Sequence, residues 1–487
     1  MSRAVGIAGP SEVAVRAGAA VAEAGGNAVD AAVAATLAAL CTEVAIVGLD
    51  AAAFVTVWRP GDAPMVIDGG IAMPGLDRPV GRFGLAGRPV TLDYGGGMHT
   101  IVGYGAVGVG GAVAALGEVA GGWSSLPWSE LLAPVARCVR EGFPLSRASR
   151  TWLEYSHREI FGWQAESAAV VHDAGGELLE AGATVRIPGL AETLDELGRE
   201  GPAAFYGGRL GDLIADCVDD GGGLLGRADR RAYRAGLRSP IHCPLDDWMI
   251  AAPPSAGGAA LAAMLARLHD VPAEAWTAEA VAELAAAQCA VFGAEPEPGA
   301  GRSSSTVHIS TLDDDGLACA VTASSGYGSG VLVPGAGIYL NNCLGELELN
   351  PLGYHGLQPG ERMASNMAPC VARRADGAML AVGSPGAERI TTALLQVMLD
   401  FMRLGMSLEE ALAAPRLHVE RIPGGWRAAV EPGLPLEAMR IPCRVFEHLS
   451  MFFGGAGAVL RENDGVLVAA ADPRRQGAAT VVRATGQ

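Results

Sequence analysis

Ser303-Ser-Ser-Thr306-Val-His-Ile-Ser-Thr311 is the stretch that decides the fold, because the chain changes character within it. Residues 294–305 are rich in Pro, Gly and Ser, cannot continue a helix and predict an exposed linker. Residues 307–311 and 317–322 then alternate around a turn of three aspartates and a glycine, which predicts a β-hairpin. The Ser305–Thr306 junction therefore divides the chain into 1–305 and 306–487, and the second part begins on a strand.

The elements predicted on either side describe a mixed α+β chain. Ser11 can cap a first helix, and residues 28–40 predict a second helix with almost no polar face, which must be buried. Residues 124–300 are mostly helical, whereas the second part is rich in strands. We predict helices at about 11–23, 28–40, 190–200, 257–290 and 389–404, strands at 52–58, 65–68, 307–311, 317–322, 331–333, 338–340 and 379–382, and a capping box of Ser407 with Glu410.

The charge balance argues against nucleic acid as a partner. The chain has 35 basic and 53 acidic residues, a formal charge of −18, which does not suit phosphate neutralisation. Its most apolar stretch, residues 28–58, is interrupted by Asp30, Glu43 and Asp50, so no window reaches the roughly 18 uncharged residues of a membrane span. The start of the chain lacks an apolar segment of signal-peptide length. We therefore expect a cytoplasmic protein that binds no membrane.

The cysteines and the motif content argue against a cofactor. The nine cysteines are odd in number, widely spread and never form a C-x-x-C pair, so we expect neither a disulfide framework nor a thiolate metal site. There is no metal-ligand set and no dinucleotide fingerprint, and we expect no metal and no cofactor. The expected partners are a small-molecule substrate and, after cleavage, the two fragments for each other.

Thr306 stands where a self-cleaving precursor would place its scissile bond. A threonine hydroxyl is a poor nucleophile at its own pKa, but a free α-amino group titrating near 8 on the same residue can take its proton. The hydroxyl can first attack the carbonyl of Ser305, shift the acyl group to oxygen and let water complete the cleavage that exposes the amine. Taken alone, a Ser-rich linker before a hairpin is also typical of an ordinary solvated loop.

An oxyanion hole is the second requirement of such chemistry. Gly383-Ser-Pro-Gly-Ala-Glu-Arg389 is a Gly/Pro turn that leads into a predicted helix. The backbone N–H groups of Gly386 and Ala387 would point at developing negative charge with the helix dipole behind them. A turn of this kind is equally typical of a structural helix start.

Several further segments stand in a fixed order along the chain. They are Gly25-Gly-Asn-Ala-Val-Asp-Ala-Ala-Val-Ala34, residues 43–54, Phe205-Tyr206, Pro253-Pro-Ser-Ala-Gly-Gly258, Gly328-Ser-Gly330, Leu340-Asn-Asn342 and Asp472-Pro-Arg474. Together with the Thr306 junction, they resemble the γ-glutamyltranspeptidase family over most of the chain. The resemblance implies the four-layer αββα sandwich of the N-terminal-nucleophile hydrolases, cut into a large fragment, 1–305, and a small one, 306–487.

The resemblance implies roles for the residues around the junction. Thr306 falls on the nucleophile of the family, provided that His308 and Ser310 match the His and Ser of its T-T-H-x-S motif. Ser324 falls on or near a second threonine that steadies the nucleophile. Gly386 and Ala387 take the oxyanion pair, in which Ala387 replaces a glycine; a backbone N–H donor tolerates that replacement if φ is negative.

The glutamate-carboxylate site departs from the family. The family's arginine lies in a D-F-R-E-x-A-P segment, and the matching stretch here, Asp68-Gly-Gly-Ile-Ala-Met-Pro74, has Gly70 at that position. The family's serine pair corresponds to Ser365 and Asn366. A bidentate carboxylate clamp is therefore missing, although Arg78 could supply a guanidinium from nearby.

The amine site is altered in part. Cys343 and Glu346 occupy the positions of the pair that binds the substrate ammonium, so an acidic residue is kept. We expect a substrate other than a plain γ-glutamyl amide. The resemblance leaves open an amidohydrolase or acyltransferase of altered specificity, a C–C bond hydrolase of alkylproline antibiotic pathways, a true γ-glutamyltransferase, and an unprocessed, non-catalytic binding protein.

Overall fold

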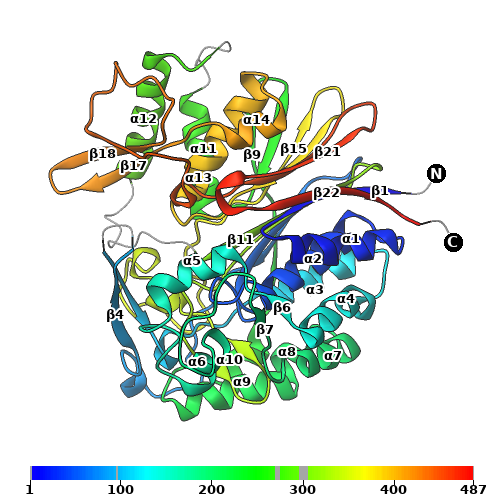
Figure 1. Cartoon of the computed structure of the whole chain (residues 1–487), viewed down its shortest axis with the longest axis vertical. Helices are drawn as coiled ribbons and strands as arrows, with labels where there is room; N and C mark the ends of the chain where they lie inside the picture. The colour runs from blue at the N-terminus through cyan, green and yellow to red at the C-terminus, as the bar shows by residue number, and fades with distance from the viewer. Residues whose placement is uncertain (1–2, 95–96, 269–274, 295–304, 486–487) are drawn as a thin grey trace.

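Two stacked antiparallel sheets form the centre of the structure, a computed structural model that describes residues 3–94, 97–268, 275–294 and 305–485 (Figure 1). The first sheet has the order β22 (Ala478–Arg483), β1 (Ala4–Gly9), β11 (Thr306–Asp313), β12 (Ala318–Ser324), β2 (Ala52–Trp58), β3 (Met65–Gly69) and β8 (Gly236–Arg238). The second has the order β21 (Leu467–Ala471), β20 (Gly457–Arg461), β16 (Met379–Gly383), β15 (Cys370–Arg374), β10 (Trp248–Ala252) and β9 (Ile241–Leu245).

A small apolar core joins the two sheets. Ala8, Leu312 and Ala318 of the first sheet pack in one buried cluster with Val371 and Ala381 of the second. Side chains alternate along a strand, so the residues of β11 that share parity with Leu312 also face the second sheet. Thr306 is one of them, and it lies at the end of the strand.

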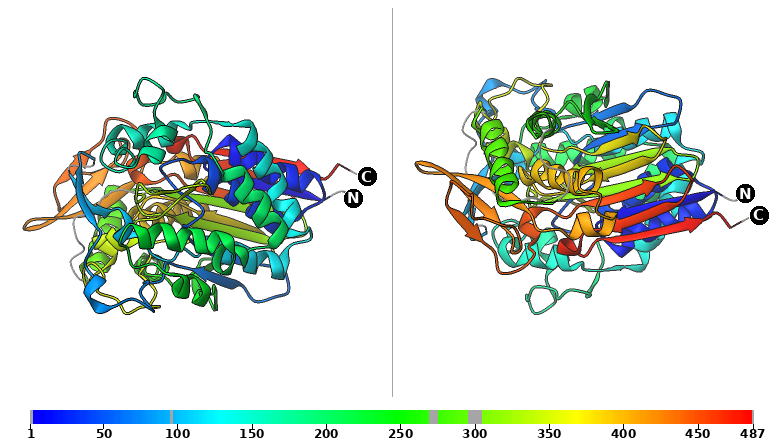
Figure 2. Two further views of the ribbon diagram at one scale, coloured as in Figure 1. Left: turned by 90° about the horizontal axis from the view of Figure 1, so that it is seen from below. Right: turned by 90° about the horizontal axis from the view of Figure 1, so that it is seen from above.

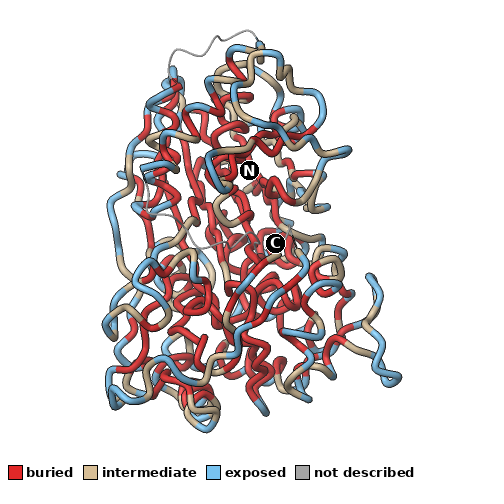
Figure 3. Tube along the Cα trace, turned by 90° about the vertical axis from the view of Figure 1, so that its left-hand side faces the viewer, coloured by how far each residue is buried: buried red, intermediate tan, exposed pale blue. Residues whose placement is uncertain are grey.

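Helices cover the outer faces of both sheets. α1 (Glu12–Glu23) and α2 (Ala28–Thr42) share a core with the outward side chains of the first sheet, such as Ile7 and Ile309. α11 (Ala256–Arg267) and α13 (Arg389–Met398) share another with Ile250 of the second. Figure 1 shows α1 and α2 below the sheets and α11 and α13 above them, and Figure 3 shows buried residues running through the middle.

The remaining elements extend these layers. The other helices are α3 (Ala112–Trp123), α4 (Trp128–Glu141), α5 (Arg147–Ser156), α6 (Ala165–Val171), α7 (Leu190–Glu200), α8 (Ala204–Gly207), α9 (Arg209–Asp220), α10 (Arg227–Ala232), α12 (Ala278–Gly293) and α14 (Leu408–Ala413). The smaller sheets pair β4 (Arg88–Leu92) with β5 (Met98–Val102), β6 (Phe143–Pro144) with β7 (Thr184–Val185), β13 (Leu332–Val333) with β14 (Ile338–Tyr339), and β17 (Leu417–Ile422) with β18 (Gly425–Val430) and β19 (Cys443–Val445).

Both sheets contain strands from the two parts of the chain, and these interleave in the first sheet. β1 of the first part lies between β22 and β11 of the second, and β2 pairs with β12. β1 and β22 run side by side near the two ends of the chain in all three ribbon views (Figures 1 and 2). Residues on either side of the Ser305–Thr306 junction therefore share backbone hydrogen bonds and cores.

The main sequence predictions are confirmed. β11 and β12 form the hairpin, with Thr306 opposite Ser324. Ser11 caps α1, α2 is buried along its whole length, and Ser407 and Glu410 form the capping box of α14. The predicted linker lies almost wholly outside the described residues.

One prediction in the first part is wrong. The run 257–290 is two helices, since α11 ends at Arg267 and α12 begins at Ala278. The region 124–300 is mostly helical, as predicted, but it also contains the short strands β6 to β10, which were not predicted individually. Trp248-Met-Ile-Ala-Ala252 of β10 is a short apolar run, and such runs have no periodicity that separates a strand from a buried helix.

None of the helices in the described part of the chain is both long enough and apolar enough to cross a membrane.

Candidate active site

The Ser305–Thr306 junction lies at the N-terminal end of β11, and the Thr306 side chain is on the side of the strand that faces the second sheet. Thr306 Oγ1 donates to Ser324 Oγ at 3.3 Å, and Ser324 Oγ donates to the carbonyl oxygen of Ser305 at 3.1 Å. The Gly326 N–H donates to Ser324 Oγ at 3.3 Å. One hydroxyl thus connects the predicted nucleophile with the carbonyl that it must attack. This arrangement arises from the strand register, which sets Ser324 opposite Thr306.

His308 supports the strand and is not placed for proton transfer. Its side chain is buried, with Nδ1 2.9 Å from Thr322 Oγ1 and Nε2 2.7 Å from Ser310 Oγ. Ser310 Oγ donates to the carbonyl of Gly457, so Nε2 carries the ring proton and Nδ1 accepts from Thr322. Burial lowers the pKa of His308 to about 3, and the ring is neutral at physiological pH.

The predicted oxyanion pair adopts an unusual backbone conformation. Gly386 has a φ of +140°, and Ala387 has a φ of +51°. The condition under which alanine is tolerated without strain, a negative φ, is therefore not met: this residue occupies the left-handed region, which costs an L-residue about 1–2 kcal/mol. Neither N–H donates to another group in the described part of the chain, so both are available to an incoming oxygen. Strain of this kind concentrates at functional sites.

One pocket brings together almost all of the predicted site residues. Its wall contains the junction, with Thr306 and Ser324, and Ala387 of the oxyanion loop; Gly386 is next to the wall but is not part of it. The predicted substrate-binding residues in the same wall are Gly70, Cys343, Glu346, Ser365 and Asn366. We call this the acyl pocket. Residues from the ends of strands and from three separate loops therefore meet at one place.

Two neighbouring carboxyl groups lie in the wall of the acyl pocket, one buried and one partly exposed. Glu346 lies in its wall with Glu348, which was not predicted from the sequence. Burial and the neighbouring Glu348 raise the pKa of Glu346 well above its usual range, and a hydrogen bond from the Cys343 thiol opposes this rise. Burial also raises the pKa of Glu348 to about 7, although the Tyr327 hydroxyl donates to its carboxylate. The spacing Glu346-Leu-Glu348 was the only sequence signal for this second acid.

Gly326 links the nucleophile to the carboxyl pair. Its φ is +66°, and a Cβ on this residue would lie 2.4 Å from Asn342 Oδ1 and 2.9 Å from a carboxylate oxygen of Glu346. Only a glycine leaves room there while its N–H reaches Ser324. Gly326 thereby fixes the distance between Ser324, which contacts the predicted nucleophile, and Glu346 of the carboxyl pair.

A buried polar network holds the loop that carries the carboxyl pair. Asn341 Nδ2 donates to a side-chain oxygen of Asp50 at 2.9 Å, and Arg230 pairs with the other oxygen of Asp50 at 3.0 Å. Both ion-pair partners are fully buried, so removal of either would leave an uncompensated charge. Asn342 accepts from the Tyr327 N–H at 2.6 Å. This network connects the first part of the chain to the second beneath the pocket.

Glycines in the 253–258 segment allow the Ser365–Asn366 wall to approach α11. The Gly257 N–H donates to the carbonyl of Ser365 at 3.1 Å, and a Cβ on Gly257 would lie 2.0 Å from the carbonyl oxygen of Asn366. Ser255 caps the same helix and donates to the Met367 carbonyl. Within the described ranges, no cluster of three or more His, Cys, Asp or Glu side chains could hold a metal ion.

A family model described as Gamma-glutamyltranspeptidase matches residues 14–291 and 279–482, which together cover most of the chain. The chain belongs to the gamma-glutamyltranspeptidase family. It is therefore an enzyme of the N-terminal-nucleophile hydrolase type.

Relatives within the gamma-glutamyltranspeptidase family carry two kinds of name. The Glutathione hydrolase proenzyme of Pseudomonas aeruginosa is 29% identical, over 98% of this chain and 94% of its own. The Acylase ACY 1 proenzyme of Pseudomonas sp. (strain V22) is 28% identical, over 95% and 90%. The crystal structure of cephalosporin acylase from Bacillus halodurans superposes with a TM-score of 0.82 at 24% identity, over 98% of this chain and 96% of that one. The similarity to the cephalosporin acylase shows a shared fold.

This member of the gamma-glutamyltranspeptidase family has no cation in its acyl pocket. The described lining residues include no Arg, Lys or His. Arg78 does not replace the missing arginine, because its guanidinium pairs with Asp219 at 3.2 Å and donates to the Leu224 carbonyl. Arg362 lies close to Gly70 but donates to the Gly70 carbonyl and stacks on Tyr233, away from the pocket wall.

Proposed function

We propose that the chain is a self-processing hydrolase or acyltransferase that attacks a carbonyl of a small molecule through Thr306 as a new N-terminus. The observation that carries the proposal is the hydroxyl of Ser324, which contacts both Thr306 Oγ1 and the Ser305 carbonyl. By donating to that carbonyl, Ser324 polarises it toward attack. Its oxygen also accepts the Thr306 hydroxyl hydrogen, which keeps the nucleophile directed toward the junction.

The self-processing step follows from this geometry. Thr306 Oγ1 forms a bond to the Ser305 carbonyl carbon and gives up its proton, the bond from that carbon to the Thr306 nitrogen breaks, and the nitrogen takes up that proton to become an amine. Water then hydrolyses the ester, which leaves a carboxylate on Ser305 and a free amine on Thr306. In later turnovers that amine serves as the base, and Gly386 and Ala387 donate to the oxyanion.

The order of layers supports the same assignment. Helices, sheet, sheet and helices follow one another, and we infer that this is the four-layer αββα sandwich of N-terminal-nucleophile hydrolases. After cleavage the fragments 1–305 and 306–487 would stay together, because strands of both lie in each sheet. A bond cut beside β11 need not separate them.

The charge of the acyl pocket supports a substrate other than a plain γ-glutamyl amide. The γ-glutamyl group carries an ammonium and a carboxylate, and a pocket with two acidic groups and no arginine disfavours the carboxylate. An acyl group with a nitrogen cation and no carboxylate fits better. The presence of acylases among the relatives agrees with such a change of acyl specificity.

Two anilides test this assignment. 4-Aminobutyryl anilide differs from γ-glutamyl anilide only by the missing α-carboxylate. The processed enzyme is expected to hydrolyse the first at least about tenfold faster in kcat/KM. Equal or faster hydrolysis of γ-glutamyl anilide would identify a true γ-glutamyltransferase instead.

A further inference from the structure

A second pocket also borders Thr306. It is lined by Thr306, His308, Glu43, Pro385 and Arg475, among other residues. The nucleophile is thus shared, since Thr306 contributes to both pockets. The oxyanion loop is shared as well, because Pro385 lines the second pocket and Ala387 the acyl pocket. A carbonyl compound extends in two directions from the atom that is attacked, and each direction has a pocket here.

Arg475 is the cation of the second pocket. Its Nε donates to the Gly454 carbonyl at 3.3 Å, and its terminal nitrogens donate to no group in the described part of the chain. The stem packs against Gly455, where a Cβ would lie 2.5 Å from Arg475 Cδ. The absence of a side chain at Gly455 therefore leaves room for the side chain of Arg475. Burial lowers the pKa of Arg475 to about 10, so the guanidinium remains charged at physiological pH.

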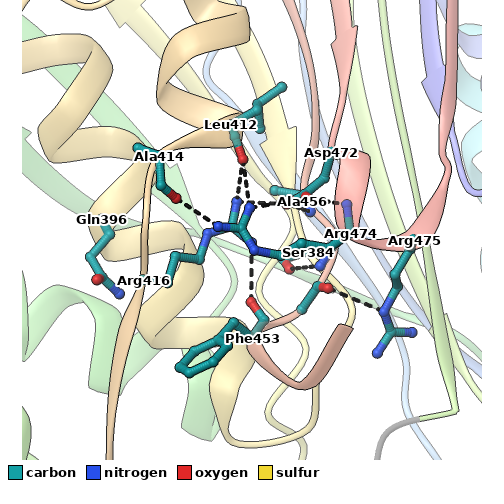
Figure 4. Close-up of polar contacts among 12 residues, drawn as sticks. Ser384, Gln396, Leu412, Ala414, Arg416, Phe453, Ala456, Asp472, Arg474 and Arg475 are labelled. Carbon is teal, nitrogen blue, oxygen red and sulfur yellow. Dashed lines mark hydrogen bonds and ion pairs between the residues drawn. The ribbon is translucent and has the colours of Figure 1, made fainter. Parts of the chain in front are cut away.

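The neighbouring Arg474 shows what an arginine with only a structural role looks like in this chain. It pairs with Glu431 and Asp472 and donates to two backbone carbonyls, and its side chain is fully buried. Arg416 also pairs with Asp472, at 2.6 Å. Figure 4 shows Arg475 directed away from this network, with its terminal nitrogens free of dashed contacts. Asp472, the acidic residue closest to Arg475 in the sequence, is therefore already paired with Arg416 and Arg474.

Glu43 is the acidic group of the second pocket, and its environment favours the neutral carboxyl group. The Ser146 hydroxyl donates to its carboxylate at 2.6 Å. Burial raises the pKa of Glu43, which favours its neutral form. No ion pair between Glu43 and Arg475 occurs in the described residues, so the guanidinium keeps its capacity for another anion.

We propose that the second pocket receives the leaving group of the substrate and that Arg475 binds a carboxylate on it. A guanidinium with two free terminal nitrogens matches a carboxylate in bidentate geometry. The acyl pocket does not offer such a contact, because its acidic side chains are Glu346 and Glu348 and its described lining includes no Arg, Lys or His. The substrate class is thus an amide with a cationic or neutral acyl part and an acidic leaving part, such as an N-acyl amino acid. This inference rests on the proposed function, since it takes Thr306 as the point of attack.

Binding of N-acetylglycine tests the site without requiring turnover. N-Acetylglycine and N-acetylglycinamide differ in one carboxylate, and their dissociation constants can be measured by calorimetry on the purified chain. A charge-assisted pair in a partly buried site predicts roughly tenfold to hundredfold tighter binding of the acid. Arg475→Gln should remove that preference, and Arg475→Lys should retain part of it.

The same substitution at an exposed arginine is the control. Arg373 lies on β15 and is exposed, so Arg373→Gln should leave the preference for the acid unchanged. All three variants should still self-cleave on a denaturing gel, which reports folding and the proposed function separately. Equal binding of acid and amide by the wild type, or a preference that survives Arg475→Gln, would overturn the assignment. A chain that remains uncut but binds the acid through Arg475 would contradict only the proposed function.

Discussion

The two sides of the acyl pocket are built from different kinds of structure. On the nucleophile side, Thr306 and Ser324 lie on paired strands, and the register fixes the contact between them. On the opposite side, Glu346 and Glu348 lie on a loop of two short 3₁₀ turns, where Glu346 is buried and Glu348 is partly exposed. A strand residue cannot move without shifting its neighbours, whereas a loop residue can change charge at little cost to the sheets. Under the proposed function, the sheets therefore position the reacting groups, and the loops determine the substrate specificity.

Replacement of the nucleophile is expected to have the largest effect. Thr306→Ala should leave the chain uncut and lower activity by at least about a thousandfold, because the attacking oxygen is lost. Thr306→Ser should cut slowly, because it keeps the hydroxyl and loses the methyl group that restricts its rotamer. A denaturing gel over time and kcat measure both. Cleavage of Thr306→Ala at the normal rate would place the nucleophile elsewhere.

Replacement of the Glu346 carboxyl group should affect substrate binding on the loop side and leave self-cleavage unchanged. Glu346→Gln is expected to lower kcat/KM by roughly tenfold to a hundredfold for amine-bearing substrates, while self-cleavage continues, because the junction does not use this carboxylate. If Glu346 has no contact with substrate, the loss should be less than about twofold for every substrate. An equal loss for amine-bearing and amine-free substrates would also contradict the proposed role.

Substitution of Gly70 by arginine should shift the substrate specificity toward the γ-glutamyl specificity that is common in the family. Gly70 lines the pocket, and a Cβ there would lie 3.0 Å from Asp68 Oδ1. Gly70→Arg is expected to raise kcat/KM for γ-glutamyl anilide by about tenfold, since a guanidinium can pair with the α-carboxylate. Gly70→Ala is the matched control, because it adds the Cβ without the charge. An equal gain in both variants would show that the charge is not the cause.

The carboxyl pair should give binding of a cation a pH dependence. Burial raises the pKa of Glu348 to about 7, so this group is mostly neutral at pH 6 and mostly ionised at pH 8. Cation binding should therefore strengthen as pH rises, and kcat/KM for 4-aminobutyryl anilide relative to butyryl anilide should increase by about threefold to tenfold. The ratio cancels the titration of the Thr306 amine, which both substrates share. Glu348→Gln should flatten it, and an unchanged slope in that variant would assign the titration to another group.

The smallest expected effect concerns the oxyanion loop. Ala387 has a φ of +51°, which glycine adopts without strain. Ala387→Gly should leave activity within about twofold, because the backbone N–H is kept, and should change the unfolding free energy by less than about 1 kcal/mol, since relief of strain opposes the greater entropy of the unfolded chain. Thermal unfolding and kcat measure the two effects. A loss of activity above tenfold would mean that the methyl group itself contacts the substrate.

Much of the strand side could be predicted from the sequence. The Asp-rich turn with alternating flanks indicated the hairpin, and the hairpin alone places Ser324 opposite Thr306. The loop side was predicted in part, because Cys343, Glu346 and the Ser365–Asn366 segment do reach the same pocket. These residues come from distant parts of the chain, and only the family resemblance connected them.

The features that were missed depend on burial and on contacts distant in sequence. Glu348 resembles any acid in a polar loop until Tyr327, 21 residues away, is seen to donate to it in a buried site. Arg475 is one of two consecutive arginines, and no pattern distinguishes the one whose terminal nitrogens have no hydrogen-bond partner among the described residues. The positive φ of Ala387 was likewise not expected, since alanine rarely adopts it.

Intact mass spectrometry of the purified wild-type chain under denaturing conditions tests the central claim most directly. Self-processing at the end of β11 predicts two species, and N-terminal sequencing of the smaller one should read Thr-Val-His-Ile-Ser from Thr306. A single species with the mass of the uncut chain, or a small fragment that begins at any other residue, would contradict Thr306 as the N-terminal nucleophile.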